Sequence, residues 1–156
     1  MERMAAPGPP VPEGDDPIVR ALDVLRSRSG FLVMREAFYG TRRFDDFARR
    51  LVMSPSSLAT RLRALVDDGL LSRVAYQESG SRTRQEYALT DKGRALLPVL
   101  VALLRWGNDY LPAASTGLEL VHATCGTAVR AEVLCGCAHG VQLEELRAVP
   151  TPGVSA

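Results

Sequence analysis

Apolar residues recur at helical spacing in the first part of the chain. Ile18, Ala21, Leu22 and Leu25 lie three or four positions apart, which predicts a first helix of about ten residues. A second, shorter helix is expected over residues 31–38, where apolar residues dominate again. A glycine two positions after this stretch is a natural helix terminator.

Two more helices are predicted directly afterwards. The third covers residues 44–51, where phenylalanine, alanine and leucine form an apolar stripe. The fourth begins at Ser54 and Pro55, because a serine can accept hydrogen bonds from the free amides and proline fits the first helical turn. It is expected to reach Asp68 and to end at Gly69.

The pattern then changes from helical to alternating. Residues 70–77 and 84–89 alternate well enough to be strands, and the Ser-Gly-Ser sequence at 79–81 supplies turn chemistry. These features predict a β-hairpin. A fifth helix is expected over residues 90–110, with a kink because Pro98 lies inside it.

The two ends of the chain differ from the region between them. Of the ten prolines in 156 residues, five lie within residues 1–17, which predicts a disordered N-terminal tail. Residues 150–156 are expected to be a short C-terminal tail. Between them, one domain with its following long helix is predicted over residues 18–111, and a small β-rich appendage over residues 118–149.

The overall composition is that of a soluble chain with a core. Apolar residues make up 46% and charged residues 24% of the sequence. No run approaches the 18 apolar residues of a membrane-spanning helix, and the N-terminus lacks the pattern of a secretory signal. We therefore expect a cytoplasmic protein without a membrane partner.

Charge is distributed unevenly along the chain. The formal net charge is +1, but residues 41–84 carry +4 and residues 107–156 carry −3. A central basic block of this kind is a candidate surface for binding a polyanion such as nucleic acid.

The order of helices and hairpin is that of a winged helix-turn-helix, in which one helix enters the DNA major groove and the hairpin touches the backbone. The predicted fold class is therefore mainly α (α+β), with a two-stranded wing. At about 100° per residue, Leu58, Leu62 and Leu65 fall on one arc of the fourth helix, and hydroxyl and arginine side chains fall on the opposite arc. The residues expected to contact DNA are Arg42, Arg43, Ser54, Ser56, Ser57, Thr60, Arg61, Arg63, Arg82 and Arg84. Taken alone, the fourth helix also fits an amphipathic surface helix with a solvated basic face; the ordered combination of elements favours DNA.

Several segments resemble the HxlR family of bacterial transcription regulators, which are relatives of the MarR type. They read FLVMREAFYGTRRFDDFARRL at 31–51, SPSSLATRLRALVDDGLLSR at 54–73 and EYALTDKGRALLPVLVALLRWG at 86–107, with a weaker match at 18–25. The resemblance implies a homodimeric, DNA-binding winged helix that represses or activates nearby genes. It also implies that the helix starting at Ser54 is the recognition helix.

The sequence departs from the family pattern at two places. Family members often carry a cysteine just before the first helix, where this chain has Asp15 and Asp16, so the family's thiol-sensing mechanism is not transferred. Members also often read Gly-Arg-Trp-Thr where this chain has Ser-Arg-Ser-Gly at 27–30, which removes an aromatic core residue.

The fifth helix is apolar over most of its circumference, more than one small domain can cover. Its apolar residues are Leu96, Leu97, Val99, Leu100, Val101, Leu103, Leu104 and Trp106, with Pro98 among them. A central core helix and a dimer interface both explain this pattern, and we favour a homodimer that reads an inverted-repeat operator.

All cysteines and histidines lie within 18 residues, in the pattern His122-x2-Cys125-x9-Cys135-x-Cys137-x-His139. Paired soft ligands next to glycines resemble the knuckles of a zinc ribbon, so His122, Cys125, Cys135 and Cys137 are candidate zinc ligands, with His139 as an alternative to His122. A thiol switch at Cys135 or Cys137 and an inert appendage are the competing interpretations.

The sequence thus predicts a sequence-specific DNA-binding transcriptional repressor that acts as a homodimer and answers to a small-molecule or redox effector. The alternatives are a winged-helix protein-interaction module and a metal- or thiol-responsive sensor. An enzyme is not expected, because no catalytic Ser-His-Asp order, nucleotide-binding loop or paired-carboxylate arrangement stands out.

Overall fold

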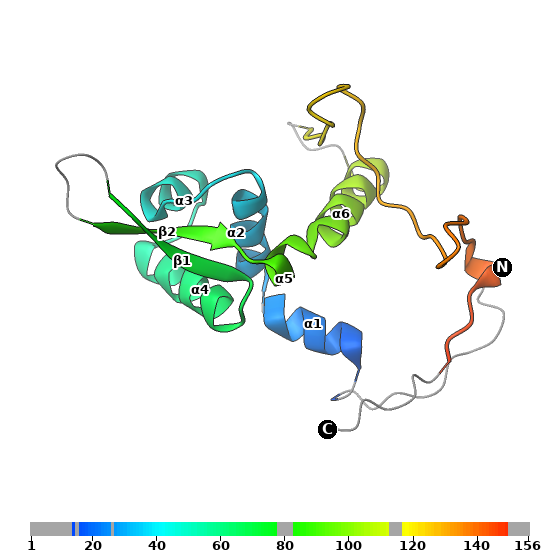
Figure 1. The fold of residues 1–156 in the computed structure, drawn as a ribbon, viewed down its shortest axis with the longest axis horizontal. Coiled ribbons are helices and arrows are strands. Elements are labelled where there is room, and N and C mark those ends of the chain that lie inside the picture. Colours follow the sequence, from blue (N-terminus) through cyan, green and yellow to red (C-terminus); the bar gives the residue numbers. More distant parts are fainter. Residues whose placement is uncertain (1–13, 15, 26, 78–82, 113–116, 150–156) are drawn as a thin grey trace.

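A computed structural model describes residues 14, 16–25, 27–77, 83–112 and 117–149. Three helices and a β-hairpin form one end of the molecule, and a further helix with a C-terminal appendage forms the other (Figure 1). The elements are α1 (Pro17–Leu25), α2 (Arg28–Phe38), α3 (Phe44–Arg50), α4 (Pro55–Asp67), β1 (Leu71–Tyr76), β2 (Arg84–Leu89), α5 (Asp91–Arg94), α6 (Leu97–Tyr110) and the 3₁₀ turn η2 (Leu143–Glu145). The predicted fold class, a mainly α winged helix-turn-helix, is confirmed.

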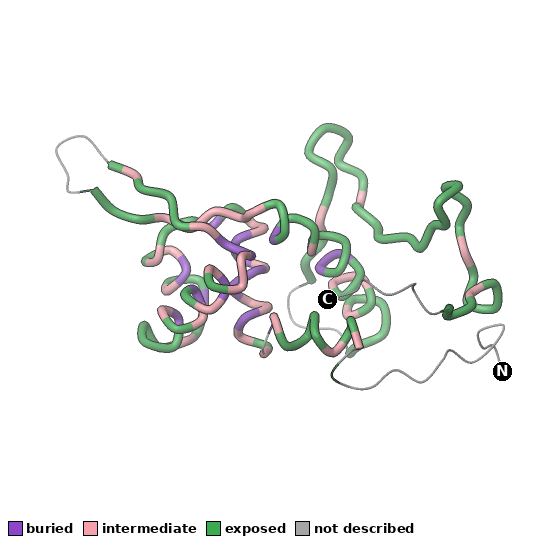
Figure 2. Tube along the Cα trace, turned by 60° about the horizontal axis from the view of Figure 1, so that its bottom comes forward, coloured by how far each residue is buried: buried purple, intermediate pink, exposed green. Residues whose placement is uncertain are grey.

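The core lies where α2, α3 and α4 meet the base of the hairpin (Figure 2). The stripe predicted for α4 faces inward: the side chains of Leu58, Leu62 and Leu65 are exposed by only 0%, 0% and 2%. They pack with fully buried residues of α2 and α3, including Met34 and Phe47. Because burying each large apolar side chain contributes about 1.5–3 kcal/mol, this stripe fixes how α4 is rotated about its axis.

Helix α2 begins three residues earlier than the sequence pattern predicts. Ser27 caps it, since its Oγ accepts a hydrogen bond from the Gly30 amide at 3.3 Å. The first turn of α2 requires a glycine at position 30 because the backbone of α1 approaches closely there. A Cβ at this position would lie 2.3 Å from the Leu25 carbonyl oxygen at the end of α1.

The hairpin is fixed to the helices at its base. Strands β1 and β2 are antiparallel, with Leu71 opposite Leu89 and Tyr76 opposite Arg84. The Thr90 hydroxyl caps α5 by accepting from the Gly93 amide, and it donates to the carbonyl of Gly69 at 2.6 Å. The helix terminator expected at Gly69 is confirmed by its φ of +73°. The predicted turn at residues 79–81 lies outside the described residues.

The predicted fifth helix is broken rather than only kinked. It consists of α5 and α6, with Pro98 in the first turn of α6. Proline has no amide hydrogen for the carbonyl of Arg94, four positions before it, and its ring would clash with that carbonyl. The chain therefore restarts its helix at Leu97.

The appendage has little regular structure. In its described part it contains isolated antiparallel bridges, between Val121 and Ala128 and between Leu134 and Gly140, and the turn η2. It joins the rest of the molecule at α6, where the Asn108 side-chain amide donates to the carbonyl of Leu118 at 2.9 Å. No helix in the described ranges is long and apolar enough to cross a membrane. The predicted tails, 1–17 and 150–156, fall almost wholly outside the described residues.

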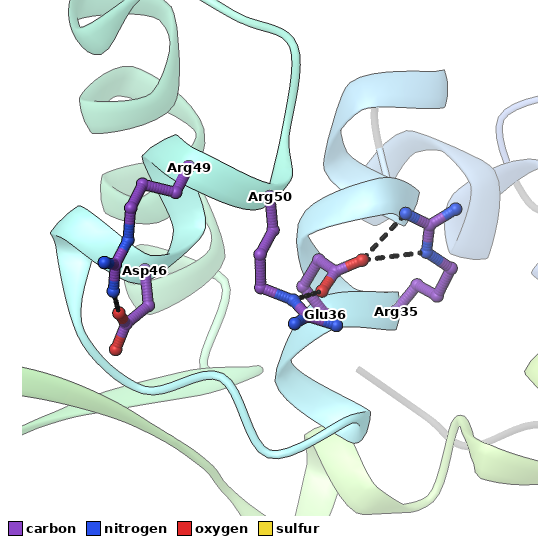
Figure 3. Close-up of polar contacts among 5 residues, drawn as sticks. All are labelled: Arg35, Glu36, Asp46, Arg49 and Arg50. Atoms are coloured by element: carbon purple, nitrogen blue, oxygen red, sulfur yellow. Dashed lines mark hydrogen bonds and ion pairs between the residues drawn. The ribbon is translucent and has the colours of Figure 1, made fainter.

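A buried carboxylate joins α2 to the end of α3. The side chain of Glu36 receives hydrogen bonds from Arg35 at 2.8 Å and from Arg50 at 2.5 Å (Figure 3). Burial on its own raises the pKa of Glu36, but the hydrogen bonds and charges of Arg50 and Arg35 together outweigh it and hold the pKa below its ordinary value. The ionised form is therefore the one that stabilises the fold.

Replacing this carboxylate tests its contribution. We expect Glu36→Gln to lower the free energy of unfolding by about 1–2 kcal/mol at pH 7, because an ionised acceptor of two arginines is lost. Since the folded pKa is lowered, this stabilisation is present above the unfolded pKa of about 4.3 and is lost as the pH falls through the folded value. Urea unfolding of both proteins between pH 3 and pH 7 measures it.

The matched control is Asp46→Asn, which breaks the solvent-exposed pair between Asp46 and Arg49 on α3 (Figure 3). That substitution should change stability by less than about 1 kcal/mol. A difference between wild type and Glu36→Gln that stays constant across the pH range would contradict the prediction.

Candidate nucleic-acid interface

The outward face of α4 is the centre of the candidate interface. Ser56, Ser57, Thr60 and Arg63 are exposed along it, and Arg61 is half-buried at its flank. Ser56, Thr60 and Arg63 lie at helical spacing on the side away from the leucine stripe. The structure thus brings together the five residues of α4 that the sequence predicted to face DNA.

Serine hydroxyls organise the start of α4. The Ser54 Oγ accepts from the Ser57 amide at 3.2 Å, donates to the Ser57 Oγ at 2.9 Å and lies 3.1 Å from the Ser56 Oγ. Ser54 is therefore the helix cap, and its hydroxyl is committed to the protein. The positive end of the helix dipole, together with the amides of the first turn, faces the same way as these serines and suits a phosphate.

Thr60 and Arg63 present different chemistry to a partner. The Thr60 hydroxyl donates to the Ser56 carbonyl at 3.0 Å, which leaves its methyl group and an oxygen lone pair for a base edge. Within the described ranges Arg63 makes no ion pair, so its guanidinium donors are available. Arginine is the side chain best suited to a guanine edge or a phosphate.

Arg42 and Arg43 hold the wing in place, a role that sequence reasoning missed. The Arg42 guanidinium pairs with Glu86 of β2 at 2.9 Å, and the Arg42 carbonyl accepts from the Tyr87 amide at 2.8 Å. The Arg43 guanidinium lies 4.7 Å from the ring centroid of Tyr76 on β1. Both arginines connect the α2–α3 loop to the hairpin. Glu86 and Tyr76 gave no sequence signal, because a strand contact to a distant loop has no periodicity.

Only part of the predicted wing surface is described. Arg84 is exposed at the start of β2, opposite Tyr76. Arg82 lies outside the described residues. An exposed arginine on a hairpin beside a recognition helix is placed to contact the neighbouring backbone.

The cysteines and histidines occupy two separate turns. In the first, the Nδ1 of His122 lies 3.2 Å from the Sγ of Cys125, and in the second, Cys135 and Cys137 flank one glycine. Each turn is closed by its own backbone hydrogen bonds, such as that from the Cys135 amide to the His139 carbonyl at 3.0 Å.

The thiols in these turns are exposed and free. Hydrogen bonds from the hydroxyl and amide of Thr127, and then from His122, lower the pKa of the Cys125 thiol to about 7. Backbone amides of Cys137 and His139 lower the pKa of Cys135. Thiolate character of this kind suits both metal binding and oxidation.

The four predicted zinc ligands are not brought together. Among the described residues, no three side chains of His, Cys, Asp or Glu converge on a point where a metal ion could sit. The physical reason is that each turn closes on itself and no apolar core draws the two turns together. His122 and Cys125 form one half of a possible ligand set and Cys135 and Cys137 the other. Zinc binding stays a prediction.

Comparisons with known proteins agree with this geometry. The model of the HxlR-like helix-turn-helix family matches residues 24–115. The chain is 38% identical over 146 residues to the HTH-type transcriptional regulator Rv3095 of Mycobacterium tuberculosis, which covers 92% of this chain and 90% of the relative. It is 37% identical over 106 residues to the HTH-type regulator sll1512 of Synechocystis, covering 67% and 77%.

Solved structures extend the similarity to the fold. PA1607, assigned as a transcription factor, has a TM-score of 0.77 at 38% identity, covering 87% of this chain and 95% of PA1607. The redox regulator HypR in its reduced form has a TM-score of 0.54 at 29% identity, covering 60% and 91%. The exposed face of α4, the wing beside it and these similarities lead to one conclusion. This chain belongs to the HxlR-like helix-turn-helix family of transcriptional regulators.

Proposed function

We propose that this protein is a sequence-specific DNA-binding repressor that acts as a homodimer on an inverted-repeat operator. The observation that carries the proposal is the outward face of α4, on which Ser56, Thr60 and Arg63, which forms no ion pair with a described residue, stand opposite a fully buried leucine stripe. In the proposed complex this face enters the major groove and Arg63 reads a base edge. Arg84 contacts the flanking backbone, and a dimer placed over a promoter excludes the polymerase.

The apolar surface outside the winged helix supports a dimer. On α6 the side chains of Leu103, Trp106 and Tyr110 are half or more exposed, and on α1 those of Ile18 and Leu22 are too. Apolar groups of this size are seldom left in water when they lie together on one helix. In the proposed dimer the α6 helices of two chains cover each other, and the two α4 helices lie about 34 Å apart, one turn of DNA.

The effector is proposed to act through the appendage. HypR, with which this chain shares its fold, is a redox regulator. The exposed thiols of Cys125 and Cys135, with their lowered pKa values, give this chain groups that an oxidant or a metal ion can reach. Because the carbonyl of Leu118 is hydrogen-bonded to Asn108 of α6, a conformational change in the appendage would be transmitted to the proposed dimer helix.

Arginine substitutions test the base-reading assignment. We expect Arg63→Ala to weaken binding to the operator by about 1–3 kcal/mol, with a much smaller effect on random DNA. Arg84→Ala should weaken binding to both by a similar factor, because a backbone contact carries no sequence information. Fluorescence anisotropy with the gene's upstream region and with a scrambled duplex measures both.

Arg130→Ala, in the exposed appendage, is the control of equal charge change. Equal losses on operator and random DNA for Arg63→Ala would show that this residue does not read bases. Absence of operator binding by the wild-type protein would overturn the proposed function and favour a protein-interaction module.

The ion pair between Arg42 and Glu86, which clamps the wing to the α2–α3 loop, leads to a prediction opposite to that of simple electrostatics. Glu86→Gln removes a negative charge near the DNA face, which on charge alone should strengthen binding. Because Glu86 holds Arg42 and thereby orients the wing, we instead expect binding to weaken about two- to fivefold on all DNA. Asp67→Asn, at the exposed end of α4, is the control and should bind as tightly as the wild type or tighter. Tighter binding by Glu86→Gln would disprove the clamp.

The oligomeric state is a separate test. Size-exclusion chromatography with light scattering should give about twice the 16.9 kDa of one chain for the wild type. Leu103→Glu on α6 should give the monomer mass with its helical circular dichroism retained, whereas Glu144→Lys in the appendage should leave the dimer intact. A wild-type protein that elutes with the mass of one chain would refute the proposed dimer.

A further inference from the structure

A groove of about 670 Å³ lies between the start of α2 and the turn that joins α3 to α4. Ser27, Arg28 and Arg35 line it on the α2 side, and Arg50 and Val52 on the other. None of these residues belongs to the recognition helix or to the wing. The groove is therefore a separate surface, for which the interface described above gives no role.

The groove has an excess of positive charge. Of its three arginines, Arg35 and Arg50 share one carboxylate, Glu36 (Figure 3), so one of these two charges is uncompensated. Arg50 donates to Glu36 through Nε and its side chain is 55% exposed, which leaves its terminal nitrogens for another acceptor. Arg28 is exposed and has no ion pair in the described part of the chain.

The groove also adjoins the N-terminal end of α4, which enters the major groove in the proposed complex. Val52 and Met53 line it and directly precede Ser54, the cap of α4. Val52 is fully exposed, although its side chain is apolar and gains nothing from contact with water. The N-terminal residues of a recognition helix contact base edges, so the surface beside that end faces the sugar-phosphate backbone of the same site.

We propose that this groove binds a backbone phosphate that flanks the major-groove site. Each subunit then contacts DNA at three places: α4, the wing and the groove. The proposal rests on the proposed function and extends its footprint. Arg28 and the terminal nitrogens of Arg50 donate to the phosphate oxygens, and Val52 packs against the adjoining deoxyribose. Glu36 holds Arg50 in the orientation that this contact needs.

Arg28→Gln is the variant that tests the groove, because Arg28 forms no ion pair with the residues that the structure describes, and its loss should leave thermal stability unchanged. Binding to operator and to random DNA is measured by anisotropy between 50 and 300 mM salt, with Arg130→Gln as the control. We expect Arg28→Gln to weaken both by a similar factor and to reduce the slope of log K against log salt by about 1 per subunit. Phosphate ethylation interference should lose one flanking position in each half-site, with the central positions kept.

Other results would overturn the proposal in distinguishable ways. If the wild type binds its operator and Arg28→Gln has the same affinity, salt slope and interference pattern, the groove does not contact DNA and the proposed function stands. If Arg28→Gln leaves DNA binding unchanged but fails to bind a small organic anion such as benzoate, which the wild type binds, the groove is assigned to that anion instead. If the wild type does not bind DNA at all, both proposals fail together.

Discussion

The burial of one leucine stripe determines what the rest of the molecule can do. Leu58, Leu62 and Leu65 are almost completely inaccessible, and any rotation of α4 about its axis would expose them at a cost of about 1.5–3 kcal/mol each. Because the helix cannot rotate, Ser56, Thr60 and Arg63 must point outward. The direction of this face is thus set by the core. Arg63 makes no ion pair with the described residues, and Thr60 keeps a methyl group and an oxygen lone pair free beside its hydrogen bond to the Ser56 carbonyl, so both remain available to another molecule.

A second constraint sets the wing relative to this face. The hairpin base is tied to Gly69 and to α5 through Thr90, and farther along it is tied to the α2–α3 loop through Arg42 and Arg43. A two-stranded hairpin is only marginally stable by itself, so these ties give it a defined direction. The arginines therefore have two different roles: Arg42 and Arg43 orient the wing, whereas Arg63 is available for DNA.

The sequence predicted the helices well because each depends on local signals: apolar spacing, the cap at Ser54 and the terminator at Gly69. It placed the start of α2 three residues too late, since the apolar pattern begins only at Phe31, whereas the helix is capped at Ser27 and its first turn approaches the Leu25 carbonyl closely at Gly30. The roles of Arg42 and Arg43 could not be predicted either, because their partners lie more than 30 residues away along the chain. Composition identified a basic region but could not tell which of its arginines form ion pairs within the described structure. The same limit applies to Cys135 and Cys137, whose spacing suggests ligands although the two turns stay apart.

The two ends of the molecule carry opposite charge, and this separation has a consequence for how it meets DNA. Residues 41–84, which contain α3, α4 and the first strand of the wing, carry a net charge of +4, whereas residues 107–156 carry −3. In the fold the wing and the appendage extend to opposite ends (Figure 1). Like charges repel and unlike charges attract over about 8–10 Å at physiological salt. A phosphate backbone therefore attracts the winged helix and repels the appendage. The thiols of the appendage are exposed to solvent, and the appendage is joined to α6 by the hydrogen bond between Asn108 and Leu118. The helix that carries the exposed apolar surface, α6, therefore also connects the appendage to the winged helix, through α5.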